Sequence, residues 1–336
     1  MTAMANWSCS TPKPPEAKGA FLWSAAPALC ILPDSIAKLV EVSATVRIGR
    51  MSYENIIYEK RGPIAYITLN RPDKLNALSD DLQFEVREAL EDAGWADDGI
   101  RVIVLKAAGR AFSAGFDITS SSKTNAVQLR ARFLKGKTFS GSAWWDVFWN
   151  NPKPIIAQIH GFCIAGGLAT ATFCDLRICS EDAKFGAPEI RTGGPYIPAV
   201  WPWVVGMSKA RELLYTGNLI DADEAKRLDL VNEVVPADEL DAAVERHALT
   251  IAKLPAVTVE YNKKLINMSY ELMGVRQVVE RSMELEAAAL ASKESSPEID
   301  EFNEIRAKDG LKAALSWNAA RFTEEDAWFK KSRERG

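Results

Sequence analysis

The sequence lacks the features that mark a membrane protein or a histidine-ligated metal site. Its apolar run at residues 20–32 is too short for a bilayer, which takes about 20 apolar residues to cross, so we expect no membrane association. Only two histidines occur, His160 and His247, and neither belongs to an HExxH motif or a histidine cluster. We therefore expect no metal ion.

Paired cysteines and an excess of basic charge are also absent. The five cysteines are an odd number without the short paired spacings of a disulfide scaffold or a zinc site, which favours a reducing, cytoplasmic location. The net charge is −4 and no predicted helix is dense in lysine. We therefore expect neither a nucleic acid nor an anionic lipid surface as a partner.

Residues 1–50 differ in composition from the rest of the chain. They are rich in proline and have few regularly spaced apolar positions, so we expect a disordered extension or a mis-assigned start, with Met51 as the functional beginning. A signal peptide is the alternative, because Lys13 and Lys18 precede the apolar run. The rest of the chain is long enough for one large globular domain and an additional helical region.

Residues 51–254 alternate between strand and helix patterns, which predicts an α/β core. Over 80–96 apolar residues recur at helical spacing, and Ser79 precedes them as a candidate N-cap. Short β-rich runs, typical of buried strands, lie at 64–69, 102–105, 155–159 and 176–179.

Residues 255–336 show no strand pattern, and helical spacing predominates. We expect this part to be a separate helical region. The predicted helices lie at 257–271, 275–292, 297–307, 309–321 and 324–334.

Two segments break from apolar runs into small residues and glycine. They are residues 111–118 (Ala-Phe-Ser-Ala-Gly-Phe-Asp-Ile) and 159–168 (Ile-His-Gly-Phe-Cys-Ile-Ala-Gly-Gly-Leu). A single glycine pair most often serves a turn or close helix packing. Two such segments allow backbone N–H groups to converge on one point, which is the arrangement of an oxyanion hole for a carbonyl oxygen that gains negative charge.

Five motifs together resemble one family. Residues 70–78 (Asn-Arg-Pro-Asp-Lys-Leu-Asn-Ala-Leu), the two glycine segments, Cys174-Asp175 and residues 184–189 (Lys-Phe-Gly-Ala-Pro-Glu) occur in the order and spacing of the crotonase (enoyl-CoA hydratase/isomerase) superfamily. The resemblance implies a spiral of ββα units followed by a C-terminal helical trimerisation region. It also implies a homotrimer, or a hexamer built as a dimer of trimers.

The resemblance implies enolate chemistry on an acyl-CoA thioester, with coenzyme A as part of the substrate and no separate cofactor. The amides of Phe116 and Gly166 fall at the positions of the oxyanion donors, and Glu189 falls at the position of a catalytic glutamate. Apolar and proline-bearing surroundings are expected to raise the pKa of Glu189, which suits a general acid or base.

The sequence departs from enoyl-CoA hydratases at one position. Those enzymes place a second glutamate three residues after the glycine donor, where this chain has Ala169, with Thr170 and Thr172 nearby. A single glutamate is similar to enoyl-CoA isomerases and to some hydratase-lyases. We expect a hydratase/isomerase type with one carboxylate, either as a proton shuttle or with a hydroxyl or backbone partner for water.

Three other functions remain open on this fold: hydrolysis of a CoA thioester, hydrolysis of a carbon–carbon bond, and RNA binding without catalysis. The acidic net charge counts against RNA.

The resemblance also implies a set of substrate contacts. CoA is expected along residues 71–78, where Lys74 can meet a phosphate. The aromatic cluster over 144–149 is typical of core packing or a subunit contact, but the resemblance places this helix beside the acyl tail, which implies a bulky or aromatic acyl group. A C-terminal lysine that meets the nucleotide in some relatives is replaced by Trp317, with Lys312 or Arg321 as substitutes. The expected substrate-binding residues are Lys74, Leu75, Ala77, Ala114, Phe116, Asp117, Ile118, Gly166, Trp145 and Tyr196.

Three further expectations concern packing. Trp201 and Trp203 are assigned to the loop after Glu189, and Arg191 is expected to form an ion pair with an acidic neighbour. The C-terminal helices are expected to close subunit interfaces with apolar faces. Those faces include Val275, Val278, Val279, Met283 and Leu285.

Overall fold

The computed structural model describes residues 53–118, 142–194, 200–291 and 296–333. The expectations for residues 1–50 and for Tyr196 lie outside these residues. Residues 52–336 form one compact unit, which is the part described below. Within the described ranges, every helix is too short or too polar to cross a bilayer.

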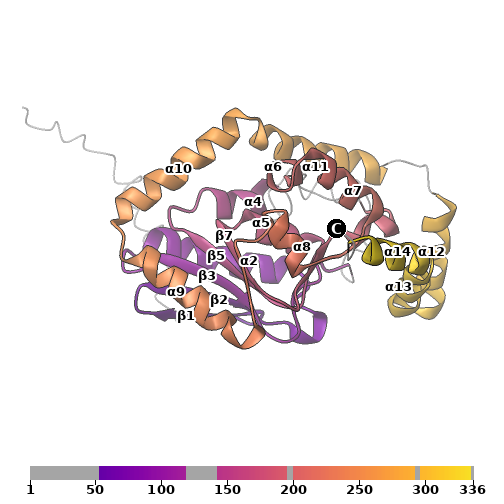
Figure 1. The fold of residues 1–336 in the computed structure, drawn as a ribbon, viewed down its shortest axis with the longest axis horizontal. Helices are drawn as coiled ribbons and strands as arrows, with labels where there is room; N and C mark the ends of the chain where they lie inside the picture. The colour runs from indigo at the N-terminus through magenta and orange to yellow at the C-terminus, as the bar shows by residue number, and fades with distance from the viewer. Residues whose placement is uncertain (1–52, 119–141, 195–199, 292–295, 334–336) are drawn as a thin grey trace, which may run out of the picture. The chain divides into compact units, whose positions relative to one another are not determined.

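A six-stranded sheet forms the centre of the core (Figure 1). Its strand order is β1-β2-β3-β5-β7-β10, and every neighbouring pair is parallel except β1 and β2. Strands β2, β3 and β5 are almost wholly buried, as expected for a parallel sheet covered on both faces. The four strands predicted from the sequence are confirmed. The bounds are Ile56–Arg61 (β1), Ile64–Leu69 (β2), Val102–Ala107 (β3), Ile155–Ile159 (β5), Leu176–Ser180 (β7) and Glu233–Val235 (β10).

A second, smaller sheet has the order β4-β6-β8-β9. The pairs β4–β6 and β6–β8 are parallel, and β9 is antiparallel to β8. These strands were not predicted from the sequence, because two or three residues are too few to show a period. Their bounds are Ala111–Ser113 (β4), Phe162–Ile164 (β6), Lys184–Gly186 (β8) and Ile220–Asp221 (β9).

The chain alternates between the two sheets. From β3 to β8 each strand of the large sheet is followed by one of the small sheet, and α5 connects β6 back to β7. This repeated path is the predicted spiral of ββα turns. Ser79 directly precedes helix α2 (Asp80–Glu91), and its hydroxyl accepts a hydrogen bond from the amide of Leu82. The predicted N-cap is therefore confirmed.

The remaining helices of the core cover the sheets. Trp201 is fully buried and opens α6, so its assignment to a loop was wrong: the apolar Trp-Pro-Trp-Val sequence packs as a short helix. The bounds are Ser142–Trp149 (α4), Gly166–Phe173 (α5), Trp201–Val204 (α6), Met207–Thr216 (α7), Ala222–Arg227 (α8) and Leu240–Ala252 (α9).

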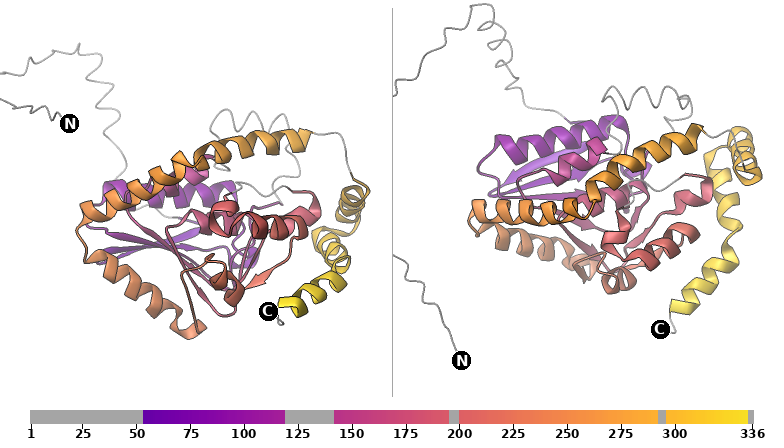
Figure 2. Two further views of the ribbon diagram at one scale, coloured as in Figure 1. Left: turned by 45° about the horizontal axis from the view of Figure 1, so that its top comes forward. Right: turned by 90° about the horizontal axis from the view of Figure 1, so that it is seen from above.

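In the described residues from 256 to 333, the C-terminal region contains five helices, as predicted. Helices α10 and α11 follow one another along one side of the core, and α12 to α14 form a separate group of shorter helices (Figure 2). Their bounds are Ala256–Leu272 (α10), Val275–Ala291 (α11), Pro297–Asp309 (α12), Leu311–Ala320 (α13) and Thr323–Arg333 (α14).

Helix α10 is anchored to the core by a buried ion pair. The Lys263 ammonium donates to the Asp175 carboxylate at 2.8 Å and to the carbonyl oxygens of Phe148 and Lys153 at 3.2 Å. The same Asp175 oxygen accepts the amide of Ile155 at the start of β5. The Cys174-Asp175 motif thus joins a core strand to the C-terminal helices.

Not all of the residues expected on α11 can contact another subunit. Val275 and Val279 are buried in the main core of the same chain, so their assignment to a subunit interface was wrong. Leu285 is 70% exposed. The larger apolar surface lies on α10 instead, where six side chains are each more than half exposed. They are Val257, Tyr261, Leu265, Ile266, Met268 and Leu272.

Candidate active site

Three neighbouring parallel strands deliver the three predicted catalytic residues to one edge of the small sheet. Phe116 follows the end of β4, Gly166 follows the end of β6 and Glu189 follows the end of β8, each by two or three residues. Because the strands run in the same direction, their carboxyl ends lie together. Ligands in α/β folds characteristically bind outside this end of the strands.

The segments that follow β4 and β6 are in direct contact. Gly115 has φ +98°, and a Cβ atom there would lie 2.6 Å from the Cβ of Ala165 and 3.0 Å from the nitrogen of Gly166. A Cβ on Gly166 would lie 2.6 Å from the Phe116 ring. Gly115 requires glycine, because its φ is positive and a Cβ would press on the Gly166 backbone, whereas a Cβ at Gly166 would displace the Phe116 ring.

The amides of Phe116 and Gly166 are available as donors. The amide of Leu78 donates to the carbonyl of Gly115, and the carbonyl of Leu78 accepts from the amide of Asp117. These two hydrogen bonds use the groups on either side of the Phe116 N–H and not the Phe116 N–H itself. Gly166 is the first residue of α5, where an amide has no partner within the helix. Within the described residues neither amide donates a hydrogen bond.

The peptide before Gly166 is held in a strained conformation. Ala165 has φ 50° and ψ −131°, a region that residues with a side chain rarely occupy. Its N–H donates to the carbonyl of Gly186 on β8, and its own carbonyl accepts the amide of Ala169 on α5. These two bonds set the direction of the Gly166 N–H.

Residues 71–78 are joined to the β3–β4 connection and to the start of β4 by a buried asparagine. The Asn76 amide donates to the carbonyl oxygens of Ala108 and Ala111, both at 2.8 Å, and its side-chain oxygen accepts the amide of Arg71. The Arg71 guanidinium pairs with Asp117 at 3.0 Å. Arg71 and Asn76 belong to a motif of the sequence, but their structural roles were not predicted, because the complete burial of a polar side chain such as Asn76 is visible only in the fold.

Most of the expected CoA contacts lie in this joined region. Lys74 is exposed, and Leu75 and Ala77 are half-buried beside it. The amide of Ala114 donates to the carbonyl of Leu75 at 2.9 Å. Ile118 is 42% exposed, with its carbonyl bonded to Arg306 on α12. Among the residues that the structure describes, no His, Cys, Asp and Glu side chains gather into a metal site.

Glu189 lies on a 3-10 helix, η4 (Pro188–Thr192), directly after β8. Burial removes water from its carboxyl group and raises the pKa of Glu189 to about 8. Its Oε2 atom is buried and makes no hydrogen bond to any part of the chain that the structure describes. A polar atom in this state lacks the partner that buried groups normally have, and it is free to bond to a substrate.

Among the residues that the structure describes, a second glutamate does not accompany Glu189 at these strand ends. Ala169, where hydratases carry a second glutamate, is fully buried. The Thr170 hydroxyl donates to the carbonyl of Gly166 and accepts from the Trp144 indole, and the Thr172 hydroxyl donates to the carbonyl of Ala169. Both hydroxyl protons are therefore committed to the backbone.

Of the two residues expected to bind the acyl group, Trp145 lies within the described residues and Tyr196 lies outside them. Trp145 is 1% exposed, stacks on Trp149 at 4.6 Å between ring centres and lies under the guanidinium of Arg276. Trp144 is the tryptophan that bonds to α5. The role of Trp145 in binding stays a prediction.

The sequence resembles known enzymes of one kind. It matches the family described as enoyl-CoA hydratase/isomerase over residues 59–309. It is 34% identical over 243 residues to a crotonyl-CoA hydratase of Syntrophomonas wolfei, which covers 71% of this chain and 89% of that protein. It is 35% identical over 221 residues to a short-chain-enoyl-CoA hydratase of Clostridium acetobutylicum, which covers 65% of this chain and 82% of that protein.

Comparison of the three-dimensional structures indicates the same family. The crystal structure of an enoyl-CoA hydratase/isomerase from Xanthobacter autotrophicus Py2 superimposes with a TM-score of 0.74 at 35% identity, covering 81% of this chain and 99% of that one. The family match spans most of the chain, and the spiral of two sheets is common to both structures. This chain belongs to the enoyl-CoA hydratase/isomerase family of enzymes and has the crotonase fold.

Proposed function

We propose that the protein transforms an enoyl-CoA thioester through an enolate, with Glu189 as the only side-chain acid and base and the amides of Phe116 and Gly166 as the oxyanion donors. The observation that carries the proposal is the buried Glu189 carboxyl, with one oxygen free of bonds to the described residues, at the same strand ends as the two free amides. A carboxyl with a pKa of about 8 both takes and returns a proton near neutral pH.

A single base suits a proton shuttle. For isomerisation of a 3-enoyl thioester, the carboxylate takes a proton from C2, the two amides stabilise the charge on the thioester oxygen, and the resulting carboxylic acid returns a proton to C4. The double bond moves by one carbon, and no water is consumed. The absence of a carboxylate at Ala169 and the bonded hydroxyls of Thr170 and Thr172 support this form of the reaction.

Hydration is the second candidate, because the relatives named above are hydratases. In that reaction Glu189 takes a proton from water, the oxygen of the water bonds to C3, and a proton is delivered to C2. Hydrolysis of the thioester or of a carbon–carbon bond is a further alternative on the same fold. Incubation of a panel of enoyl-CoA thioesters in deuterated water, followed by mass spectrometry, separates these reactions by where the label and the oxygen appear.

The substrate contacts are part of the proposal. Lys74 is proposed to meet a CoA phosphate, with Leu75, Ala77, Ala114, Asp117 and Ile118 along the same segment. Trp145 and Tyr196 are proposed to select a bulky or aromatic acyl group. The exposed position of Lys74 supports its role.

Removal of the carboxylate tests the proposal directly. We expect Glu189→Gln to fold and to bind CoA, and to lose at least about a hundredfold in kcat, because an amide neither takes nor returns a proton. Steady-state kinetics on the best substrate of the panel measures this. Glu181→Gln, at an exposed glutamate, is the matched control. Activity of Glu189→Gln within threefold of the control contradicts the assignment.

The pKa of Glu189 predicts how stability varies with pH. The carboxyl ionises near 4.5 in the unfolded chain and near 8 in the native protein, so between these values the unfolded state binds fewer protons and the native state loses stability as the pH rises. The largest slope for one group is about 1.4 kcal/mol per pH unit. We expect Glu189→Gln to be more stable than wild type by an amount that grows from pH 5 to pH 8.

Urea unfolding at fixed protein concentration measures this difference, with Glu181→Gln as the reference. A stability difference between Glu189→Gln and wild type that stays constant from pH 5 to pH 8 shows that the carboxyl is not held neutral by burial.

The oxyanion donor at Gly166 is tested by a pair of variants. Gly166→Ala keeps the N–H but presses on the Phe116 ring, whereas Gly166→Pro also removes the N–H, at a first helical position that proline tolerates. We expect kcat to be lower in the proline variant by about a further hundredfold, the usual effect of losing one oxyanion donor. Equal kcat values in the two variants exclude this amide as a donor.

We propose that the protein is a homotrimer, or a hexamer made of two trimers, with the exposed apolar residues of α10 covered by another copy. This surface supports the proposal because a large exposed apolar patch is unusual in a monomer. Light scattering is expected to give three or six times the chain mass of 37.0 kDa. Leu265→Glu is expected to shift the protein toward monomers, and the similarly exposed Trp95 serves as the control in Trp95→Glu. A monomeric wild-type protein contradicts the proposal.

A further inference from the structure

Arg191 connects the helix that carries Glu189 to the C-terminal end of the fold. It lies two residues after Glu189 in η4, and its side chain is 11% exposed. Its guanidinium meets both carboxylate oxygens of Asp326 on α14, at 2.7 and 3.0 Å. A two-point pair of this kind fixes orientation as well as distance. The ion pair expected for Arg191 is therefore present, with a partner from a distant part of the chain.

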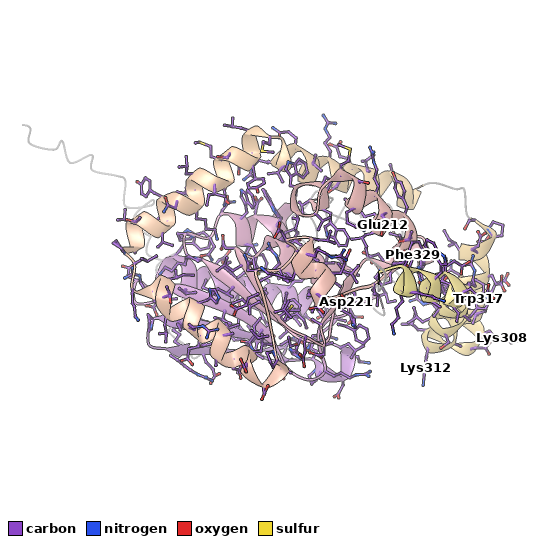
Figure 3. All side chains as sticks on the ribbon, in the orientation of Figure 1. Glu212, Asp221, Lys308, Lys312, Trp317 and Phe329 are labelled. Atoms are coloured by element: carbon purple, nitrogen blue, oxygen red, sulfur yellow. The ribbon has the colours of Figure 1, made fainter. Side chains whose placement is uncertain are left out.

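The Arg191 guanidinium also makes hydrogen bonds and a ring contact with other parts of the chain. Nε donates to the carbonyl of Thr216 at the end of α7, and Nη2 donates to the side-chain oxygen of Asn218, both at 2.7 Å. The ring of Phe322 lies 4.3 Å from the guanidinium carbon. Arg191 is thus held between α7 and α14. In Figure 3, the label of Glu212 marks α7 and the label of Phe329 marks α14.

Helix α12 presses on the far end of the same 3-10 helix. Gly193, which ends η4 with φ +83°, lies so close to α12 that a Cβ atom there would be 2.5 Å from the Cδ1 atom of Ile299. On the other side of the site, Arg306 of α12 donates to the carbonyl of Ile118 at 2.9 Å. Helix α12 therefore contacts the chain segments that directly follow Glu189 and Phe116 in the sequence.

The 3-10 helix needs such support. It has five residues, no side chain caps its beginning, and none of its residues is fully buried. The hydrogen bonds of 3-10 helices are weaker than those of α-helices, so short pieces depend on their surroundings. The contacts of Arg191 supply that support two residues from the carboxyl group.

We propose that Arg191 is a positioning residue, which through its pair with Asp326 holds η4 so that the Glu189 carboxyl faces the strand ends, and that α14 thereby contributes to catalysis without touching the substrate. The proposal rests on the proposed role of Glu189. Arg191 is 11% exposed and Asp326 is 46% exposed, so the pair links a mostly buried guanidinium to a carboxylate at the surface. Its contribution is geometric, because a displacement of about 1 Å at a reacting group can lower the rate by about a hundredfold.

The test compares substitutions on α14. We expect Asp326→Ala to lower kcat at least tenfold while KM stays within twofold, and to move the pH profile of kcat/KM to lower pH, because a displaced η4 admits water to Glu189. Asp326→Glu is expected to keep most of the activity, since it preserves the carboxylate. Glu325→Ala, at the exposed neighbour on the same helix, is the control and is expected to behave as wild type. Circular dichroism and light scattering on each full chain report folding and assembly.

A second variant examines the two-point geometry. Arg191→Lys keeps the charge but offers one donor group in place of the planar pair, so we expect it to lose kcat as Asp326→Ala does. Asp326→Ala with the kcat and pH profile of Glu325→Ala overturns the proposal, as does a loss of kcat that only follows the loss of folded protein.

Glu189→Gln in the same assay separates the two claims. If Glu189→Gln is inactive and Asp326→Ala is normal, only the positioning role fails. If Glu189→Gln is active, the proposed function fails and the positioning role fails with it.

Discussion

Three strands of three residues each, β4, β6 and β8, pair side by side in parallel, and the candidate active site follows from that pairing. Their carboxyl ends bring Phe116, Gly166 and Glu189 to one edge of the small sheet. The two glycine segments that follow β4 and β6 touch at Gly115, where a Cβ would lie 3.0 Å from the nitrogen of Gly166. Short strands of this kind are stable only as part of the larger spiral, so the site depends on the whole core.

The environment at these strand ends has two opposite effects on charge. Two amides that donate no hydrogen bond within the described residues, together with the start of α5, favour a negative charge at this point. Burial disfavours a negative charge on Glu189 and raises its pKa. An enzyme that moves a proton between carbon atoms needs both effects, because the carboxyl must be able to hold the proton while the thioester oxygen carries the charge.

The C-terminal helices have more than one function in this fold. Helix α10 is anchored through Lys263 and presents an exposed apolar surface, whereas α12 and α14 contact the segments that hold Phe116 and Glu189. The same region that is proposed to form the oligomer therefore also contacts the candidate active site. A change in how these helices pack is expected to affect both.

Periodicity and capping are local properties of the chain, so the sequence alone predicted the fold class, the strands at 64–69 and 155–159 and the five C-terminal helices seen in the described residues. Ordered motifs also indicated the family. The folded chain was needed to show that Val275 is core, that Asn76 joins two segments and that Arg191 meets Asp326, 135 residues away. Burial and pairing depend on which distant segments meet, and no local pattern records that.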